Sequence, residues 1–425
     1  MEEIQANDAS SEMLFQKQGV VMIVRRFCIS AICVLNLFLG AALASEADAI
    51  GISQNIRARH MPFGIIVDPI FASPDSDQIV GYTRCGDSAI WTGHYLAAEA
   101  FRYNVTKSAE ALDNVKAALG GLSSLLNVTG TNLLARCLIP MNSPYAQAII
   151  QEEGSHGVYQ NTGAGYYWIG NTSRDQYSGV FFGLGVAYDL VDDAGVRTAI
   201  GSLATLLLDF LRGHNWFVTM PNGAVSTTFV GRADQQLSLL QVGRHVNSRR
   251  FSTTYDLHRF FLAPEAIVPI SVEVLDDNSY FKFNIDSINL FNLIRLERSS
   301  FGGIYREAYS VLRRHTDDHG NAFFNMIDRA LNGPSEARDS ETRRILDEWL
   351  LRPRRDLPTD LRGVYPACGA EDRACKPIPI VQRVRTDFLW QRSPFQLVGQ
   401  GTGRIETAGI DYILPYWMAR YYGIL

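Results

Sequence analysis

The sequence predicts an all-α protein assembled from helical hairpins. Apolar residues recur at helical spacing in paired segments, the turns within each pair are short, and the links between pairs are long. Strand signals are few by comparison. The chain has 425 residues, of which 47% are hydrophobic, so it holds enough apolar material for one large core.

The N-terminus has the pattern of a secretory signal peptide. Arg25 and Arg26 precede the apolar stretch 27–44, which ends in Ala-Leu-Ala, a small-residue cleavage pattern. Met22 is a candidate for the true start of translation. The alternative is a transmembrane anchor, for which the stretch is short. We assign residues 1–45 to a signal peptide, which implies a secreted or periplasmic protein.

Four cysteines follow the signal peptide. Cys368 and Cys375 lie close together in one loop and are expected to pair, which leaves Cys85 to pair with Cys137. The alternative is four free thiols. A zinc site is disfavoured because the cysteines lack paired ligand spacing and no histidine lies near them in sequence. We expect no metal and no other cofactor.

The first helical hairpin follows an irregular segment, 46–84. It comprises helices over 88–105 and 109–126, joined by a very short turn. Because the two helices are antiparallel, Cys85 before the first and Cys137 after the second lie at the same open end. A disulfide between them would therefore clasp the hairpin.

The second hairpin comprises 177–191 and 196–211. Its first helix repeats a pattern of the first hairpin at an interval of about 87 residues: an aspartate followed by an aromatic, a hydroxyl residue and a glycine. The aspartates are Asp87 and Asp175, and the triplets are Trp91-Thr92-Gly93 and Tyr177-Ser178-Gly179. A third unit begins near Asp234. Further helical patterns cover 278–295, 299–314, 318–331, 338–350 and 407–423, the last around Pro415, and 216–230 predicts a β-hairpin.

The long links are expected to emerge at one end of the molecule. If the hairpins pack side by side, their first helices run parallel, and the links 138–170 and 213–233 both leave from the same rim. Loops of this length in a compact domain are usually functional or disordered, and these are rich in Tyr, Trp, Gly and Asn. Asp87, Asp175 and Asp234 start first helices, so we expect them at that rim.

In these features the chain resembles the six-hairpin glycosidase-like superfamily, including the unsaturated uronyl hydrolases. The local pointers are GDSAIWTG and TSRDQYSG. The resemblance implies a single (α/α)6-type toroid domain over 85–425, with long loops and a small β-hairpin at one rim. It also implies a general acid and a general base at inner-helix ends, which by position are Asp87 and Asp175.

Hydrolysis of a glycosidic bond requires two carboxyl groups, one that protonates the leaving oxygen and one that activates water or attacks carbon. Two aspartates on parallel helices with axes about 9 Å apart fit the wider separation used by inverting enzymes. The alternative for each aspartate is a plain N-cap. Arg174 is expected to orient Asp175 or to bind a uronate carboxylate.

Sugar rings stack on aromatic side chains, and their hydroxyls need polar partners. The candidate substrate-binding residues are Trp91, His94, Tyr167, Trp168, Arg174, Tyr177, Arg392 and Glu406. Trp390 and Trp417 are further aromatic candidates, although we favour core packing for Trp417. The alternative for the whole set is helix packing, which also uses many aromatic residues.

The expected partner is an oligo- or polysaccharide. A net charge of −5 without a basic block argues against nucleic acid, and no membrane span is expected after the signal peptide. The G-x-G-x-G pattern in 399–406 lacks the strand–turn–helix context of a phosphate cradle. Two other functions stay open: a polysaccharide lyase with a base such as His258, and a non-catalytic glycan-binding or envelope scaffold.

Overall fold

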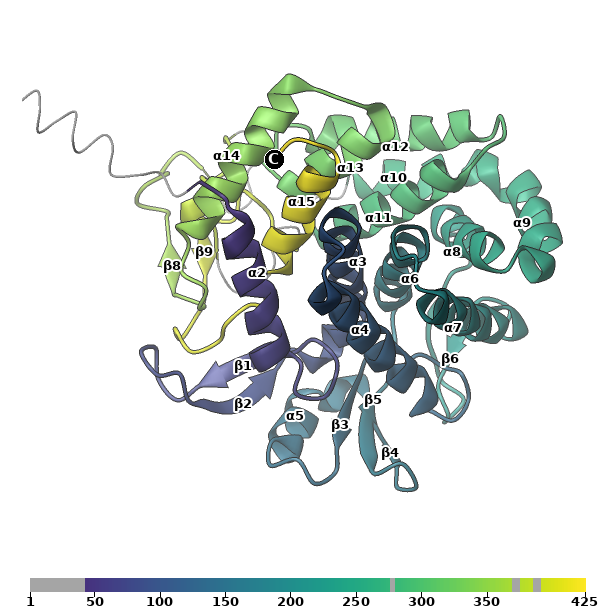
Figure 1. Cartoon of the computed structure of the whole chain (residues 1–425), viewed down its shortest axis with the longest axis horizontal. Helices are drawn as coiled ribbons and strands as arrows, with labels where there is room; N and C mark the ends of the chain where they lie inside the picture. The colour runs from purple at the N-terminus through teal and green to yellow at the C-terminus, as the bar shows by residue number, and fades with distance from the viewer. Residues whose placement is uncertain (1–42, 276–279, 369–374, 385–390) are drawn as a thin grey trace, which may run out of the picture. The chain divides into compact units, whose positions relative to one another are not determined.

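The computed structural model describes residues 43–275, 280–368, 375–384 and 391–425, which are mostly helical (Figure 1). This confirms the predicted helical class. The predicted signal peptide lies almost wholly outside the described residues. The longer helices are α2 Glu46–Asn55, α3 Ser88–Thr106, α4 Ala109–Asn127, α6 Arg174–Leu190, α7 Ala194–Gly213, α8 Ala233–Val246, α9 Ser248–Leu262, α11 Phe281–Leu296, α12 Gly302–Thr316, α13 Ala322–Asn332, α14 Glu336–Leu350 and α15 Ile410–Tyr421.

Helices that follow one another form hairpins, as predicted. Lys107 and Ser108 alone separate α3 from α4, and Asn247 alone separates α8 from α9. Ser108 starts α4 by accepting a hydrogen bond from Ala111 N at 3.4 Å, and Lys107 ends α3 in the left-handed conformation. Short connections of this kind place neighbouring helices antiparallel.

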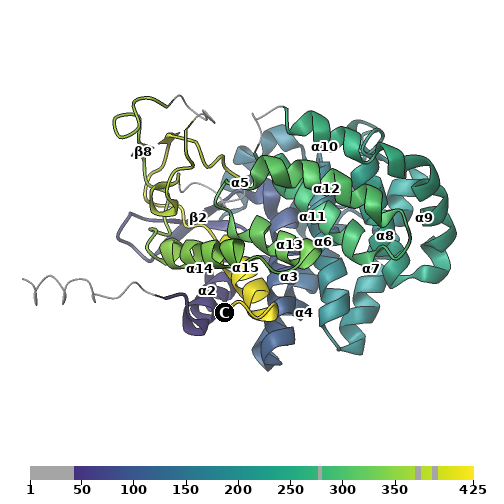
Figure 2. The same ribbon diagram turned by 90° about the horizontal axis from the view of Figure 1, so that it is seen from above.

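Six helices are buried on nearly all faces: α3, α6, α8, α11, α13 and α15. Each contacts the next in chain order, and α15 contacts α3. Helices α4, α7, α9, α12 and α14 each follow one of the first five and bury a single stripe. Figure 2 shows α9 at the periphery and α6 and α11 further inside. Five of the six buried helices are therefore the first helices of hairpins, and the sixth is α15.

Glycines set the crossing of α3 and α6. A Cβ on Gly93 would lie 2.1 Å from the carbonyl oxygen of Gly179, and a Cβ on Gly183 would lie 2.2 Å from that of Gly93. Only residues without a side chain allow two helix backbones to approach so closely. The glycines of the repeated triplets therefore meet each other at this crossing.

The long links contain more strand than the sequence predicts. The first link folds into α5 Ala146–Glu152 and a sheet in the order β3 Cys137–Pro140, β5 Tyr166–Ile169, β4 Val158–Asn161, with both pairings antiparallel. The predicted hairpin at 216–230 is confirmed as β6 Phe217–Thr219 paired with β7 Val225–Thr228. Figure 1 shows these strands at the lower edge of the helices. Two more antiparallel pairs join β1 Asp68–Phe71 to β2 Ile79–Thr83 and β8 Thr359–Asp360 to β9 Val398–Gly399.

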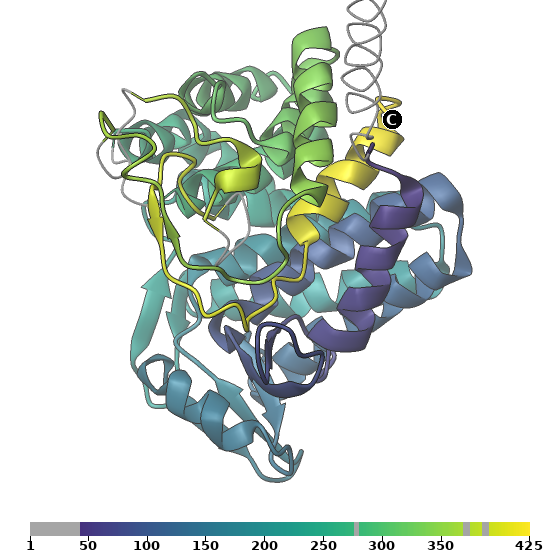
Figure 3. The same cartoon turned by 90° about the vertical axis from the view of Figure 1, so that its left-hand side faces the viewer.

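The expectation of irregular structure over 46–84 is wrong for its first part. Ser45 and Asp48 form a capping box at the start of α2, and a π-helical turn, Ile56–His60, extends the helix. Helix α2 lies beside α15 (Figure 3). It therefore packs on the last of the six buried helices.

Both predicted disulfides are present. Cys85 pairs with Cys137 and Cys368 with Cys375, with Cα–Cα distances of 5.5 and 5.9 Å. Such bonds are typical of proteins outside the cytoplasm. Among the described helices, α7 is long and apolar enough to cross a membrane, but it packs its buried stripe on α4, α6 and α8.

Candidate active site

Asp87 and Asp175 lie next to each other at the entries of α3 and α6. The side-chain amide of Gln176 donates to both: its Nε2 is 3.1 Å from Asp87 Oδ1 and 3.4 Å from Asp175 Oδ2. The two oxygens are therefore at most about 6.5 Å apart. Because this is an upper limit, it does not separate the roughly 6.5–9.5 Å spacing of inverting glycosidases from the 5–5.5 Å spacing of retaining ones.

Asp87 does not cap α3 with its side chain. The first N–H groups of α3 bond elsewhere: Ala89 N donates to Arg136 O at 3.1 Å, and Ile90 N donates to Gln176 Oε1 at 3.0 Å. Gln176 thus serves as a cap supplied by the neighbouring helix. Because the helix start is satisfied without it, the carboxylate of Asp87 is directed to Gln176 and to Gln391 Nε2, at 3.4 Å.

Ser173 and Asp175 also make no side-chain cap on α6. The Ser173 hydroxyl donates to Asp175 Oδ1 and accepts from Arg136 Nη2 at 2.7 Å. Arg136 Nη1 lies 3.7 Å from Asp87 Oδ1. One guanidinium therefore connects the two carboxylates, Asp87 directly and Asp175 through the Ser173 hydroxyl. Neither aspartate caps its helix with its side chain, so the N-cap interpretation is wrong for both.

A cavity of about 290 Å³ opens at Asp175, close to the lower end of the usual range for ligand pockets, about 300–1,000 Å³. Its lining includes three cations, two carboxylates and an aromatic ring. The lining residues are Arg136, Ser173, Arg174, Asp175, Thr227, Gln235, Glu273, Phe281, Lys282 and Ile285. They come from the segments between α4 and α6 and between α7 and α8, and from helices α6, α8, α10 Ile267–Glu273 and α11. Of these, Glu273 ends α10 and Phe281 begins α11. A small anionic ligand fits the excess of positive charge.

A second carboxyl cluster adjoins this cavity through Glu273. Arg232 Nη2 lies 3.3 Å from Asp234 Oδ2, 3.3 Å from Glu273 Oε2 and 3.2 Å from Asp286 Oδ1. Asp234 and Asp286 are fully buried. Burial raises the pKa of Asp234, and burial together with Glu273 raises the pKa of Asp286 well above its ordinary range. Asp234 thus starts α8 as predicted, but within this buried cluster.

Arg174 lines the cavity together with Asp175 and Glu273. Its Nη1 donates to Thr228 O at 3.0 Å, which turns the guanidinium toward β7. Burial and the nearby Arg232 lower its pKa, while Glu273, Asp234 and Asp175 oppose that shift. Arg174 and Asp175 therefore lie in the same cavity lining, as expected. One nitrogen of the Arg174 guanidinium already donates to a backbone carbonyl.

A histidine that the sequence does not single out lies beside the entry to α3. Glu153 is buried, accepts from Gly86 N at 2.7 Å and lies 2.6 Å from His156 Nδ1. A Cβ on Gly86 would lie 3.1 Å from the ring of His156. The residue before Asp87 is thus held tightly against a carboxylate–imidazole pair.

Several predicted binding residues are core residues instead. Trp91 and His94 are buried side by side in α3, with ring centroids 5.2 Å apart. His94 packs on Phe182 and lies 3.3 Å from Asn284 Nδ2, and burial lowers its pKa to about 4. Tyr177 is fully buried, and its hydroxyl accepts from Leu134 N at 3.3 Å. These side chains pack the interior because the inner helices have no solvent-facing side at their positions.

The link aromatics divide between core and surface. Trp168 is buried and stacks on Tyr159 at 4.3 Å, so it stabilises the β4–β5 pair, whereas Tyr167 is half-buried. Trp417 is fully buried in α15, as favoured. Trp390 lies outside the described residues.

Arg392 and Glu406 do not join the cavity lining. Arg392 is exposed, and Glu406 accepts from Asn55 Nδ2 at 2.7 Å and lies 3.4 Å from His60 Nε2. Hydrogen bonds from His60 and Asn55 and the charge of Arg354 outweigh burial and lower the pKa of Glu406 to about 2. Glu406 therefore belongs to a polar cluster that ties α2 to the C-terminal segment.

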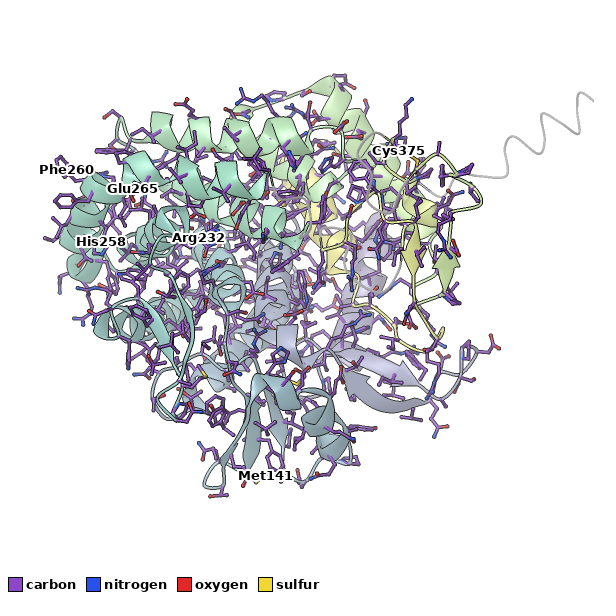
Figure 4. All side chains as sticks on the ribbon, turned by 180° about the vertical axis from the view of Figure 1, so that it is seen from behind. Met141, Arg232, His258, Phe260, Glu265 and Cys375 are labelled. Atoms are coloured by element: carbon purple, nitrogen blue, oxygen red, sulfur yellow. A yellow bond between two sulfur atoms is a disulfide. The ribbon has the colours of Figure 1, made fainter. Side chains whose placement is uncertain are left out.

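His258 is also remote from the cavity. It lies on α9, its Nδ1 bonds Thr254 O at 2.9 Å, and its ring contacts Trp216 at 5.9 Å. Figure 4 shows His258 at the periphery and Arg232 nearer the interior. The lining residues of the described cavity include no tyrosine or histidine, so a base for lyase chemistry is not found there.

Sequence reasoning missed Arg136, Gln176, Glu273 and Lys282. Gln176 stands inside the quoted motif, and its place one residue after Asp175 on a buried helix was a usable signal. Arg136, Glu273 and Lys282 reach the cavity from distant segments and carry no local pattern.

Comparison with known proteins gives no assignment: no family model, curated protein or solved structure matches this chain.

Proposed function

We propose that the protein is an exported enzyme that hydrolyses a glycosidic bond in an anionic oligo- or polysaccharide, with inversion at the anomeric carbon. The observation that carries the proposal is the pair of carboxylates on one amide, Asp87 and Asp175, beside a cavity lined by Arg136, Arg174 and Lys282. Two neighbouring carboxyls are the minimum equipment for the reaction.

The fold supports this proposal. Six buried helices that contact each other in turn, five of them followed by an outer helix, are the contacts expected of an (α/α)6-type toroid. Helix α2 takes the outer place beside α15. Export is supported by the two disulfides, which require an oxidising compartment to persist. The signal peptide predicted for 1–45 remains a prediction.

The cations give the substrate class. A carboxylate on the sugar would meet the guanidinium of Arg174 and the ammonium group of Lys282. Arg136 adds positive charge, but its Nε, Nη1 and Nη2 already donate to Asn171 O, Gly86 O and Ser173 Oγ. With the sugar held there, Asp175 faces it from the cavity wall, and Asp87 stabilises the arrangement through the shared Gln176 amide. Neutral sugars lack the group that these cations would pair.

The test is a glycan panel of uronate-containing and neutral substrates, assayed with the wild type and with Asp87→Asn and Asp175→Asn. Asp113→Asn, on the exposed face of α4, is the matched control. We expect the wild type and Asp113→Asn to release the same product and both site variants to lose activity by at least about 100-fold. The anomer released first, followed by NMR, reports inversion or retention.

Equal turnover by all four proteins would remove both aspartates from the chemistry. Binding of a glycan without any turnover would favour the non-catalytic scaffold. An unsaturated product from the wild type would show a lyase.

A further inference from the structure

Helices α9 and α10 expose large apolar side chains on their outer faces. Six residues are each more than half exposed, and we call them the apolar patch: Leu257, Phe260, Phe261, Val268, Val272 and Leu275. Their spacing is i, i+3 and i+4 on α9, and i, i+4 and i+7 from α10 onward. The opposite faces are buried, through Phe251 and Tyr255 in α9 and Ile270 in α10. Each helix therefore carries a second apolar stripe, which is exposed to solvent.

The apolar patch is larger than is usual for a monomer. Exposed fractions of 56 to 86% on these Leu, Phe and Val residues amount to about 700 Å² of surface. The largest apolar patch on a typical monomer is about 300–600 Å², and a standard interface buries about 800 Å² per partner. Figure 4 shows Phe260 at the outer edge of the molecule, and its ring contacts that of Phe261 at 5.2 Å. The patch with its rim therefore has the size of one half of a stable interface.

The charges at the two ends of α9 favour a second copy of the chain over a lipid surface. Exposed Arg249 lies at the start of α9, and exposed Glu265 lies in the turn Ala263–Glu265 just beyond its end. A helix that binds an anionic membrane carries mainly lysine and arginine beside its apolar face. Arg249 and Glu265 stand eight residues on either side of Leu257. Two α9 helices packed antiparallel about a two-fold axis at Leu257 would therefore pair each Arg249 with Glu265 of the second copy.

A groove near the start of α9 fits the exposed stripe of α10. It has a volume of about 670 Å³, and its lining includes Gly201 and Leu206 of α7 and Val246 and Asn247 just before α9. The α10 stripe lies past the other end of α9. In the antiparallel arrangement the end of each α9 meets the start of the other, so each α10 stripe would reach the groove of the second copy. The surface is therefore self-complementary, as an isologous interface requires.

We propose that the protein is a two-fold symmetric dimer in which α9 packs antiparallel on α9 of a second copy. The α10 stripe of each copy occupies the α7 groove of the other. The exposed area, the opposite charges at the ends of α9 and the position of the groove support this arrangement. The inference does not depend on the proposed hydrolysis. Because α10 ends at Glu273, which lines the candidate cavity, the second copy would contact a helix that contributes to the site.

The test is the mass of the full chain in solution, measured by sedimentation equilibrium at concentrations of about 0.1–50 μM. We expect a reversible dimer at micromolar concentration. The double variant Leu257→Ser with Phe260→Ser should weaken the dimer at least about 100-fold, because two side chains at the centre of the interface are truncated. Leu351→Ser is the matched control, since Leu351 is 62% exposed and lies outside the patch. It should associate as the wild type does.

A variant in the groove separates assembly from folding. A Cβ on Gly201 would meet only Val246 O, at 3.8 Å, so Gly201→Leu fits the folded chain and gains helix propensity. Its side chain would occupy the groove. We expect a higher urea midpoint, measured below the dissociation constant of the dimer, together with dimerisation weakened at least about tenfold. Arg249→Glu and Glu265→Arg should each weaken the dimer at least about threefold, and the two together should restore it.

Cross-linking reports the symmetry, because a residue on the two-fold axis meets its own copy. A short bismaleimide should link Leu257→Cys into a covalent dimer and leave Leu351→Cys as a monomer. A wild-type monomer at about 50 μM would overturn the proposal. So would a dimer that the Leu257 and Phe260 variant and Gly201→Leu leave unchanged, since its interface would lie elsewhere. Binding of a monomer to vesicles of phosphatidylcholine and phosphatidylglycerol, lost in the Leu257 and Phe260 variant, would assign the patch to a lipid surface instead.

Discussion

The close approach of α3 and α6 at Gly93 and Gly179 predicts how much stability Gly93→Ala should lose. The added Cβ would lie 2.1 Å from Gly179 O and 2.4 Å from Gly179 C, where ordinary contacts are 3.4–4 Å. The opposing atoms are backbone atoms, so no side chain can rotate away. Helices α3 and α6 would have to separate by about 1 Å within a close-packed interior.

The expected loss of stability combines two opposing effects. Overpacking a rigid core costs about 1–3 kcal/mol, and here the backbone on both sides places the cost at the upper end. Replacing glycine by alanine in a helix returns about 1 kcal/mol. We therefore expect Gly93→Ala to lower the free energy of unfolding by about 2 kcal/mol.

Gly120→Ala is the matched control, because Gly120 is an exposed helical glycine in α4 and its Cβ would meet nothing within 4 Å. It should gain stability by about 1 kcal/mol from helix propensity alone. The assay is urea unfolding of both variants and the wild type, followed by circular dichroism. If Gly93→Ala unfolds at the same urea concentration as Gly120→Ala, the close approach of α3 and α6 is refuted.

Two other predictions concern stability. His60 is fully buried; burial lowers its pKa, but hydrogen bonds to Asp68 and Glu406 outweigh this, and its folded pKa is above 6.5. The stability that protonated His60 contributes is therefore complete below pH 6.5 and is lost as the pH rises through the folded pKa. The urea midpoint of the wild type should fall across that pH range, and the midpoint of His60→Asn should fall less. Parallel plots of midpoint against pH for the two proteins would contradict this prediction. Removal of the Cys85–Cys137 bond, which spans 52 residues, should cost about 4 kcal/mol, and removal of Cys368–Cys375, which spans 7, about 2 kcal/mol. Two double variants check this: Cys85→Ser with Cys137→Ser, and Cys368→Ser with Cys375→Ser. The first should have the lower urea midpoint, and the reverse order would refute the prediction.

The hairpins could be predicted because their signals are local. An apolar stripe with helical period, a short turn and a capping serine such as Ser108 lie within one stretch of chain. The predicted range 109–126 differs from α4 Ala109–Asn127 by one residue for this reason. Helix α2 also carries a local signal, the capping box of Ser45 and Asp48. The same residues lie at the predicted cleavage site of the signal peptide, so they were interpreted as part of that site.

The small sheet shows where period alone fails. Strands β3, β4 and β5 have only four residues each, too short for an alternating pattern to stand out from a loop. Their pairing depends on Cys137, fixed by the disulfide, and on the stacking of Trp168 on Tyr159 across the β4–β5 pair. These are contacts between residues distant in sequence, which no local pattern reports.

The candidate site divides along the same line. Asp87 and Asp175 were predictable as neighbours because both lie at the starts of helices whose glycines meet. One repeat therefore fixes both the packing of the helices and the register of the carboxylates. The prediction that the aromatic residues of the same triplets bind substrate is wrong. A residue near a helix start can face either the rim or the interior, depending on its angular position around the helix. Trp91 and Tyr177 point into the interior.

Glu273 has no counterpart in any motif. It reaches the cavity because Arg232, at the end of a link, binds it together with Asp286 from α11, so three segments converge on one charge. Two of these carboxyls contribute little to stability, since burying them costs free energy that one guanidinium only partly offsets. A cluster that is costly to fold and opens into a cavity beside Asp175 is more readily explained by chemistry at that cavity than by packing.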